Sequence, residues 1–280
     1  MSKSEENAVY CSNLVRSDDP DRYLLSLFAP HTAQRGLWAL YAFNQEIAKI
    51  RETVSEPMLG EIRIQWWQDV LAEIKQGQVR QQPVIGELAL LLKVCPINPL
   101  LTAILEARKS GLLGDEATSF KALTDYADGV GGKLNLAAAH IVCEKLSNSG
   151  QIAAQQLGAA WAMLGLVRAI PHSWQTNAAP LTNDMISGLQ SPDVSKAYVL
   201  LQPTITKMLE YVENQRELAL SQQAQLPKAE QSLLLLAAQI KLYQVALSKV
   251  KNNPFELTKT EPTQLKKIST LFWAKLTGKF

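Results

Sequence analysis

Apolar side chains recur at helical spacing along most of this chain, and this periodicity limits the folds that it can adopt. From residue 37 to residue 54 they share one broad face, and from residue 59 to residue 74 they follow an i, i+3, i+4 pattern. The second stripe consists of Leu59, Ile62, Trp66, Val70 and Ile74. Further helices are predicted at 84–94, 99–109, 120–145, 150–170, 193–220, 228–250 and 262–277. Hairpin signals between alternating runs are missing, since Asp128-Gly129 lies inside a helical pattern, so we expect an all-α fold.

The composition fits a single domain that spans residues 1–280. Apolar residues make up 47% of the chain and charged residues 19%, which is enough to bury a core without disulfides or metal. The net charge of +2 argues against a nucleic-acid binder, because such proteins need a strongly basic surface. The segment 171–192, rich in Asn, Ser, Pro and Gly, is predicted to be the one long irregular loop.

The cysteines and the two ends of the chain limit the compartment. Cys11, Cys95 and Cys143 lie far apart without a Cys-x-x-Cys pair, which favours reduced thiols in a cytosol-like compartment. The three histidines are also dispersed, so no zinc or iron ligand set is expected. The first twelve residues contain Glu5 and Glu6 and lack an apolar core, and no apolar run is long enough to span a bilayer. We expect a soluble protein that can still lie against a membrane.

Four polar side chains interrupt the apolar stripes: Asn44, Arg51, Arg63 and Arg168. Each arginine can extend to solvent along its aliphatic stem, or pair with a nearby carboxylate such as Glu52. Alternatively, the guanidinium groups line a cavity and bind a phosphate or a carboxylate. The pattern leaves both interpretations open.

Small residues form a strip on one predicted helix. Gly158, Ala162, Gly165 and Ala169 recur at i, i+4, i+7 and i+11, so one face of the helix carries almost no side chain. Without further context, this strip indicates close packing between two helices.

Three segments resemble the squalene/phytoene synthases: the run RGLWALYAFNQEIAKI at residues 35–50, residues 126–132, and residues 157–168. The resemblance is clearest from Asp21 to Pro180. It implies an all-α, isoprenoid-synthase-type helical bundle around a central cavity. In that family, aspartates on two facing helices hold Mg²⁺, which in turn holds two prenyl diphosphates. Mg²⁺ demands hard oxygen ligands in near-octahedral geometry, so apolar groups cannot replace these carboxylates.

This sequence departs from both aspartate-rich motifs of the family. The positions that the resemblance assigns to the first motif hold Ala48, Lys49 and Glu52, and the second motif is matched by residues without acidic groups. These are Ala162, Gly165, Ala169 and Ser173, with Arg168 as the one match among the family's polar residues. The resemblance therefore implies a scaffold without the Mg²⁺–diphosphate chemistry, with no catalytic residue, no metal ligand and no cofactor.

The same resemblance suggests what a retained cavity would contain. Its candidate cavity or anion-binding residues are Asn44, Lys49, Arg51, Glu52, Arg63 and Arg168, and its expected aromatic lining is Phe43, Trp66 and Trp161. If the chain were instead an active prenyltransferase on farnesyl or geranylgeranyl diphosphate, Mg²⁺ would be expected and the basic groups would have to hold diphosphate directly. Binding of an isoprenoid or lipid without transfer is a further alternative.

Within the family, the chain most resembles the non-catalytic branch that contains the mitochondrial respiratory complex I assembly factor. The shared stretches are residues 42–48, residues 54–57 and residues 63–67. They imply an assembly or chaperone-like role for an NADH:quinone oxidoreductase, with a complex I subunit or an assembly intermediate as the protein partner. The expected location is the bacterial cytoplasm, at the inner face of the membrane, or the mitochondrial matrix in a eukaryote.

The C-terminal segment 262–280 reads as a basic amphipathic helix. Leu265, Ile268, Leu271, Phe272, Leu276 and Phe280 share a broad arc, and four lysines lie mostly around its edges. Such a helix can bind an anionic membrane surface or the groove of a partner. The alternative is a terminal helix packed on its own bundle with solvated lysines.

Overall fold

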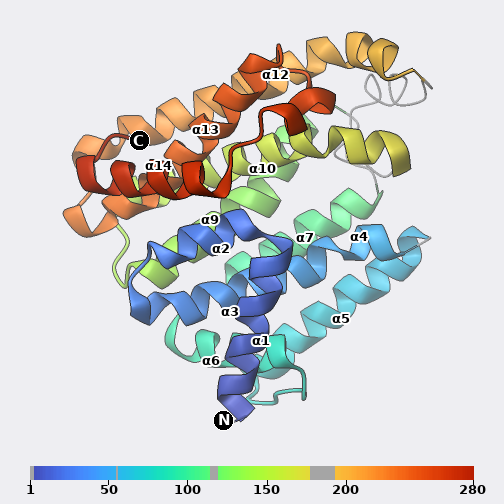
Figure 1. Ribbon diagram of the computed structural model, residues 1–280. Helices are drawn as coiled ribbons and strands as arrows, with labels where there is room; N and C mark the ends of the chain where they lie inside the picture. The colour runs from blue at the N-terminus through green and yellow to red at the C-terminus, as the bar shows by residue number, and fades with distance from the viewer. Residues whose placement is uncertain (1–2, 55, 114–118, 177–192) are drawn as a thin grey trace.

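The computed structural model describes residues 3–54, 56–113, 119–176 and 193–280, except for the side chains of Leu113, Ser173, Gln175 and Thr176. Every regular element in these ranges is a helix, as the sequence predicted (Figure 1). The first half contains α1 (Lys3–Asp18), α2 (Pro20–Leu27), α3 (His31–Ala48), α4 (Ile50–Thr53), α5 (Pro57–Lys75), α6 (Pro83–Val94) and α7 (Asn98–Leu113). The second half contains α8 (Phe120–Ala127), the π-helix η2 (Asp128–Gly132), α9 (Lys133–Val142), α10 (Asn148–Thr176), α12 (Val194–Ser221), α13 (Leu235–Lys249) and α14 (Gln264–Thr277). Three short 3₁₀ helices, η3 (Gln223–Gln225), η4 (Lys228–Leu234) and η5 (Pro254–Lys259), complete the described elements.

Several helix starts follow directly from local sequence. The side chains of Asp19, Ser119 and Thr263 accept a backbone N–H in the first turn of α2, α8 and α14, which satisfies one of the free donors there. Proline opens α5 and α6, where its missing N–H removes no helical hydrogen bond. These signals explain why the chain is divided into many helices.

Two extensive core clusters organise the bundle. Apolar residues of α1, α3, α5, α6, α7 and α9 form one cluster, and those of α8, α10, α12 and α13 form the other. In Figure 1 the two groups lie one above the other, with α10 packed against α12, η2 and α9. A small third cluster joins Leu24 of α2 to Leu235 of α13 and Leu271 of α14. The chain's last helix is therefore packed beside one of its first.

Some predicted boundaries were wrong. The helix predicted at 37–54 begins at His31 and is divided at Lys49 into α3 and α4, and the stretch 120–145 is divided by the π-helix into α8 and α9. The predicted loop 171–192 begins too early, because α10 continues through Pro171 to Thr176. A proline inside a helix removes one backbone hydrogen bond, yet the flanking turns continue here. The rest of that predicted loop, 177–192, lies outside the described residues.

The predicted apolar stripe of α5 coincides with its buried face only in part, at Val70 and at Ile74, which is partly buried. The buried residues are Gly60, Ile64, Trp67, Val70 and Leu71, which pack mainly against α7. Of the predicted stripe, Leu59, Ile62 and Trp66 are exposed instead. The helix carries apolar residues on two faces, so periodicity alone could not identify the inner one.

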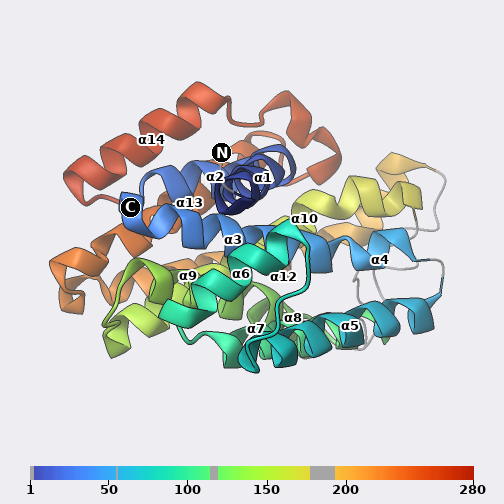
Figure 2. The same ribbon diagram turned by 90° about the horizontal axis from the view of Figure 1, so that it is seen from below.

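The C-terminal helix α14 packs on the bundle through a narrow face made of Lys267, Leu271 and Ala274. It contacts α13 and lies along one edge of the molecule, opposite α5 and α7 (Figure 2). Most of the apolar arc predicted for 262–280 faces solvent, and Leu271 alone among its members is fully buried. None of the helices in the described ranges combines the length and the apolar character that a membrane-spanning helix requires.

Candidate functional site

The resemblance assigned two motifs to this chain, and the helices that carry their positions meet at a small cavity of about 180 Å³. Ala48, Arg51 and Glu52 line it from the end of α3 and from α4, and Leu166, Ala169 and His172 line it from α10. The opposite wall is formed by Ile64 of α5, by Arg108, Gly111 and Leu112 of α7, and by Tyr126 of α8. The motif positions Ala48, Glu52 and Ala169 are thus brought together, although they are far apart in the sequence.

The cationic groups of this cavity are held by its walls. Arg51 donates a hydrogen bond from Nη1 to the carbonyl oxygen of Gly111, at 2.9 Å. Arg108 donates from Nη1 to the hydroxyl oxygen of Tyr126, at 3.1 Å, while its buried Nε has no hydrogen-bond partner among the described atoms. These arginines therefore help to position α4, α7 and α8, and Arg51 lies in the cavity wall.

The described donor set does not fit Mg²⁺. Among the cavity residues Glu52 supplies the one carboxylate, and its side chain is exposed. The side chains of Ala48 and Ala169, which also line the cavity, carry no oxygen, and hard divalent cations need several oxygen ligands in fixed geometry. In the part of the chain that the structure describes, no group of three or more His, Cys, Asp or Glu residues is arranged to hold a metal ion. The side chain of Ser173, the last motif position, lies outside the description.

Four candidate residues do not line this cavity: Lys49, Arg63, Asn44 and Arg168. Lys49 turns away and forms an ion pair with Asp18 at the end of α1, with Nζ and Oδ2 separated by 2.5 Å. This hydrogen bond lowers the pKa of the Asp18 carboxyl. Arg63 is exposed and donates to the Thr53 hydroxyl at 2.6 Å. Asn44 is buried in α3, and its Oδ1 has no hydrogen-bond partner among the described atoms.

Arg168 belongs to a buried ionic cluster on another side of α10. Its guanidinium lies over the ring of Tyr243 and 3.3 Å from Asp21 Oδ2. Asp21 also accepts hydrogen bonds from the Tyr243 hydroxyl at 2.7 Å and from Lys267 Nζ at 2.8 Å. Arg168 therefore does not line the small cavity; it connects α10 to α2 and α13.

Burial and charge compete in this cluster. Burial alone would raise the pKa of the Asp21 carboxyl, but the hydrogen bond from Lys267, the charge of Arg168 and the hydrogen bond from Tyr243 outweigh it and hold this pKa below its usual value. Burial raises the pKa of the Tyr243 phenol, so this group stays protonated and donates to Asp21. The cluster keeps a carboxylate charged inside the protein.

The small-residue strip of α10 has two roles. Gly158 and Ala162 pack against Gly131 of the π-helix, where a Cβ on either glycine would collide with the carbonyl group of the other. This confirms the predicted close packing for the first half of the strip. A Cβ added at Gly165 would meet no atom within 4 Å, and Ala169 lines the small cavity. The second half of the strip thus faces open space.

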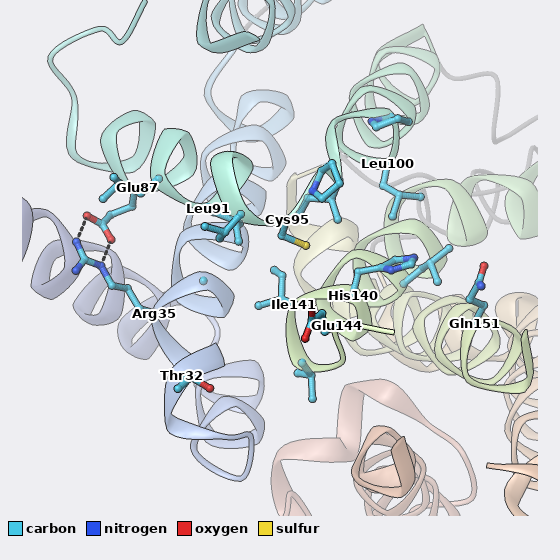
Figure 3. A pocket seen from close by; sticks show the side chains of 18 residues that line it. Thr32, Arg35, Glu87, Leu91, Cys95, Leu100, His140, Ile141, Glu144 and Gln151 are labelled. Atoms are coloured by element: carbon cyan, nitrogen blue, oxygen red, sulfur yellow. Dashed lines mark hydrogen bonds and ion pairs between the residues drawn. The ribbon is translucent and has the colours of Figure 1, made fainter. Parts of the chain in front are cut away.

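A larger recess lies on a different side of the bundle. It has a volume of about 940 Å³ and is formed by the start of α3, the end of α6, the α6–α7 connection and the end of α9 (Figure 3). Its walls are mainly apolar, with Leu90, Leu91, Ile97, Leu100 and Ile141 among them. The volume and the apolar walls are suited to an apolar ligand or to the side chains of a partner.

The recess has few polar groups. Arg35 and Glu87 form a bidentate ion pair at one end, at 2.6 and 2.8 Å, and thereby neutralise each other. Figure 3 shows Cys95 and His140 projecting from opposite walls, from the α6–α7 connection and from α9. Burial raises the pKa of the Cys95 thiol, which makes it a poor nucleophile near neutral pH.

The sequence did not reveal the recess or the contribution of α7 and α8 to the small cavity. Arg108, Gly111 and Tyr126 contact α4 or each other across distances of 18 to 60 residues along the chain. Gly111 faces the Tyr126 ring so closely that a Cβ there would collide with it. Arg108 lies in the polar stretch Glu106–Ser110, where no local pattern distinguished it, and no signal marked the recess. The expected aromatic lining was also wrong for Trp66, which is partly exposed and stacks with Arg80.

The sequence matches a model of a known protein family. The model described as squalene/phytoene synthase matches residues 15–270, which is most of the chain. This chain belongs to the squalene/phytoene synthase family. The predicted resemblance is thereby confirmed.

Solved structures show the same fold at low sequence identity. A dehydrosqualene synthase in complex with ligand superimposes with a TM-score of 0.80 and 17% identity, covering 99% of this chain and 98% of that one. The squalene synthase HpnC from Alicyclobacillus acidocaldarius superimposes with a TM-score of 0.70 and 13% identity, covering 90% and 97% of the two chains. At these identities the similarity establishes the isoprenoid-synthase-type fold alone.

Curated relatives are more similar in sequence. NADH dehydrogenase (ubiquinone) complex I, assembly factor 6 of Mus musculus is 30% identical over 165 residues, which cover 59% of this chain and 49% of that protein. Its counterpart in Homo sapiens is 29% identical over 187 residues, covering 66% and 56%. The Drosophila melanogaster homolog is 26% identical over 175 residues, covering 60% and 52%. This chain thus aligns with about half the length of the curated relatives it matches.

Proposed function

We propose that this protein is an assembly factor for an NADH:quinone oxidoreductase and that it has no prenyl-transfer activity. It would act through contact with a protein partner, a subunit or an assembly intermediate of that complex, on the cytoplasmic side of a bacterial membrane or in a mitochondrial matrix. The observation that carries the proposal is the similarity to relatives from mammals, an insect and an amoeba that bear the assembly-factor name.

The geometry of the small cavity supports the non-catalytic part of this proposal. Departure of diphosphate needs positive charge at the leaving oxygens, which bridging Mg²⁺ ions supply in enzymes of this kind. Here Ala48 and Ala169 stand where the two facing helices meet, and Arg51 is bound to a backbone carbonyl. A volume of about 180 Å³ also leaves little space for two prenyl chains.

Gene deletion tests the assembly role. In the organism that encodes this chain, deletion is expected to lower the amount of assembled NADH:quinone oxidoreductase, measured on native gels and as NADH-dependent quinone reduction. The activity of succinate:quinone oxidoreductase should be unchanged in the deletion strain, so it serves as the control. Normal levels of the NADH-oxidising complex in the deletion strain would overturn the proposal.

A direct assay tests the absence of transfer. The purified protein is incubated with farnesyl or geranylgeranyl diphosphate and Mg²⁺, and the release of pyrophosphate is followed. We expect no release above that of a protein-free control. Release that is lost on Arg51→Ala, with folding retained in the circular dichroism spectrum, would show that the small cavity is an active site.

Binding of an isoprenoid or lipid chain is a second candidate function, favoured by the large recess. Its volume of about 940 Å³ lies at the upper end of the ~300–1,000 Å³ that small-molecule sites occupy. Native mass spectrometry of the purified protein should then detect a bound apolar ligand, and Leu91→Trp should reduce its occupancy. The exposed α12 residue Leu200 offers a matched control, because Leu200→Trp adds the same volume outside the recess. Equal occupancy in both variants would exclude the recess as the site.

A further inference from the structure

The outer face of α14 carries an unusual density of exposed apolar side chains. Leu265 is 77% exposed, Leu276 65%, Trp273 59%, Phe272 56% and Ile268 43%. Phe272 and Trp273 contact each other edge to face, with ring centroids 6.1 Å apart. Single exposed apolar residues are ordinary on protein surfaces, but a continuous group of this size marks an interaction site.

This face is held outward by the packing on the opposite side of the helix. Lys267, Leu271 and Ala274 are buried against the bundle, and the Lys267 ammonium lies 2.8 Å from Asp21 Oδ1. Both ends of the helix are fixed as well. Thr263 caps the first turn, and Gly278 ends the helix in the left-handed conformation. The exposed residues therefore belong to a complete helix that cannot rotate them inward without breaking a buried ion pair.

The charged side chains of α14 are all lysines. At about 100° per residue, Lys266 and Lys275 fall just outside the two edges of the arc formed by the five apolar residues. Lys275 is tied to α2, since its Nζ donates to the Phe28 carbonyl at 2.7 Å. The Lys266 side chain is exposed to solvent. Residues 264–277 contain no Asp or Glu, so the helix itself carries no acidic side chain.

We propose that α14 is an interfacial membrane helix, which lies flat on an anionic lipid bilayer with Leu265, Phe272 and Leu276 inserted below the headgroups. Trp273 would lie at the headgroup level, where aromatic side chains are favoured, and the flanking lysines would contact lipid phosphates. A groove on a protein partner is a weaker fit, because such an interface has a polar rim, whereas Ser269 is the one polar residue of α14 inside this arc and lysines stand at its edges. The inference goes beyond the assembly role and does not depend on it.

The geometry also predicts how binding occurs. The apolar face is already exposed and the helix is already folded, so attachment requires no unfolding of the bundle. This differs from a disordered segment that becomes helical on the lipid. The bundle would be oriented with α14 toward the membrane and with α5 and α7 away from it (Figure 2).

Vesicle flotation of the full chain tests the proposal. With vesicles of phosphatidylcholine and phosphatidylglycerol, the protein should float with the lipid, and with phosphatidylcholine alone the bound fraction should fall several-fold. The double variant Phe272→Gln/Leu276→Gln should lose at least about tenfold in affinity. The matched control is Val199→Gln/Leu200→Gln on α12, which changes two equally exposed apolar residues and should bind as the unchanged protein does.

Two further measurements separate the outcomes. Subtracting the emission spectrum of Trp273→Phe from that of the unchanged protein isolates the emission of Trp273. This emission should shift to shorter wavelength when anionic vesicles are added, while the circular dichroism spectrum stays unchanged. Lys279 is a further exposed lysine, directly after the helix ends at Gly278. The double variant Lys266→Gln/Lys279→Gln should weaken binding to anionic vesicles without affecting the fold. If the protein stays unbound, and sedimentation shows a dimer that Phe272→Gln/Leu276→Gln dissociates, the face is an interface between copies of this chain and the proposal is wrong.

Discussion

At the scale of single residues, Asp21 is the buried charge on which the contacts between the two ends of the chain depend. It accepts hydrogen bonds from Lys267 and Tyr243 and lies beside Arg168. Removal of one member of a buried ion pair leaves the other member uncompensated, which is far more costly than loss of an exposed pair. The cluster is therefore the place where a single polar substitution should affect stability most.

The first prediction is a large loss of stability on Asp21→Asn. The amide is isosteric but uncharged, so Lys267 would remain buried without a counter-charge. We expect a decrease of about 3 kcal/mol in the free energy of unfolding, measured by urea denaturation. The control is Asp125→Asn, which removes the exposed i, i+4 pair with Lys121 and should cost less than about 0.5 kcal/mol. Similar losses in both variants would contradict a special role for the buried cluster.

The second prediction concerns pH, and its sign follows from the lowered pKa of Asp21 in the folded protein. A carboxyl whose pKa is lower in the folded than in the unfolded state adds stability that is fully present above the unfolded value of about 3.9. This contribution is lost as the pH falls through the lower, folded pKa. The difference in unfolding free energy between the unchanged protein and Asp21→Asn should be constant from about pH 7 to pH 5 and shrink below about pH 4. A difference that grows on acidification would be incompatible with this assignment.

The candidate residues show what a sequence can and cannot predict about a site. Ala48, Glu52 and Ala169, which the resemblance assigned to two motifs far apart in the sequence, line one cavity in the structure. The resemblance could not show that Arg168 pairs with Asp21, which lies 147 residues away in the chain. Helical spacing tells which residues share a face, but the partner of a long cation is chosen by tertiary packing that no local pattern encodes.

At the scale of whole helices, local sequence predicts where a helix begins and ends better than which of its faces is buried. The positions of most helices were predicted to within a few residues, since proline, glycine and capping residues mark their ends. The inner face of α5 was not, because Leu59, Ile62 and Trp66 form an apolar stripe beside the buried one. The π-helix was also unpredictable, since its geometry is set by the close approach of Gly131 to Gly158. The helices formed by residues 3–27 were not predicted at all.

The third prediction compares two neighbouring tryptophans of α5. Trp67 is 4% exposed and contacts the Phe43 ring edge to face, whereas Trp66 is 39% exposed and stacks with the Arg80 guanidinium. Trp67→Ala should therefore cost about 3–5 kcal/mol of unfolding free energy. Trp66→Ala should cost about 1 kcal/mol, since it removes mainly a cation–π contact. Urea denaturation of both variants would measure this, and the reverse order would indicate that the face of α5 is wrongly assigned.

The fourth prediction compares two glycines of α10. Gly158→Ala places a Cβ against the backbone carbonyl of Gly131, which cannot move without shifting the π-helix, so we expect a loss of about 2–3 kcal/mol. Gly165→Ala places the same atom in open space inside a helix, where alanine is favoured over glycine by roughly 0.5–1 kcal/mol. Thermal unfolding should therefore show opposite shifts. A stabilising Gly158→Ala would refute the close packing of α10 on the π-helix.

At the scale of the whole molecule, the last helix is both a part of the core and an outward surface. Its inner residues Leu271 and Ala274 pack with Leu24 of α2 and Leu235 of α13, and Lys267 completes the charge balance of Asp21. Its outer residues contact nothing within the described bundle that would bury them. The two faces can thus be changed independently, one affecting stability and the other affecting what the protein binds.

The fifth prediction follows from this division. A chain that ends at residue 262 loses the whole inner face of α14 and leaves Asp21 without its ammonium partner, so its melting temperature in circular dichroism should fall by several degrees or more. The full chain with Phe272→Gln and Leu276→Gln keeps every inner contact, and its melting temperature should stay within about one degree of the unchanged protein because surface substitutions rarely exceed about 0.5 kcal/mol. Equal melting temperatures for the truncated and the full chain would mean that α14 is not part of the folded core. The positions of α2 and α13 would then depend on their other neighbours, which are α1 and α3 for α2 and α10 and α12 for α13.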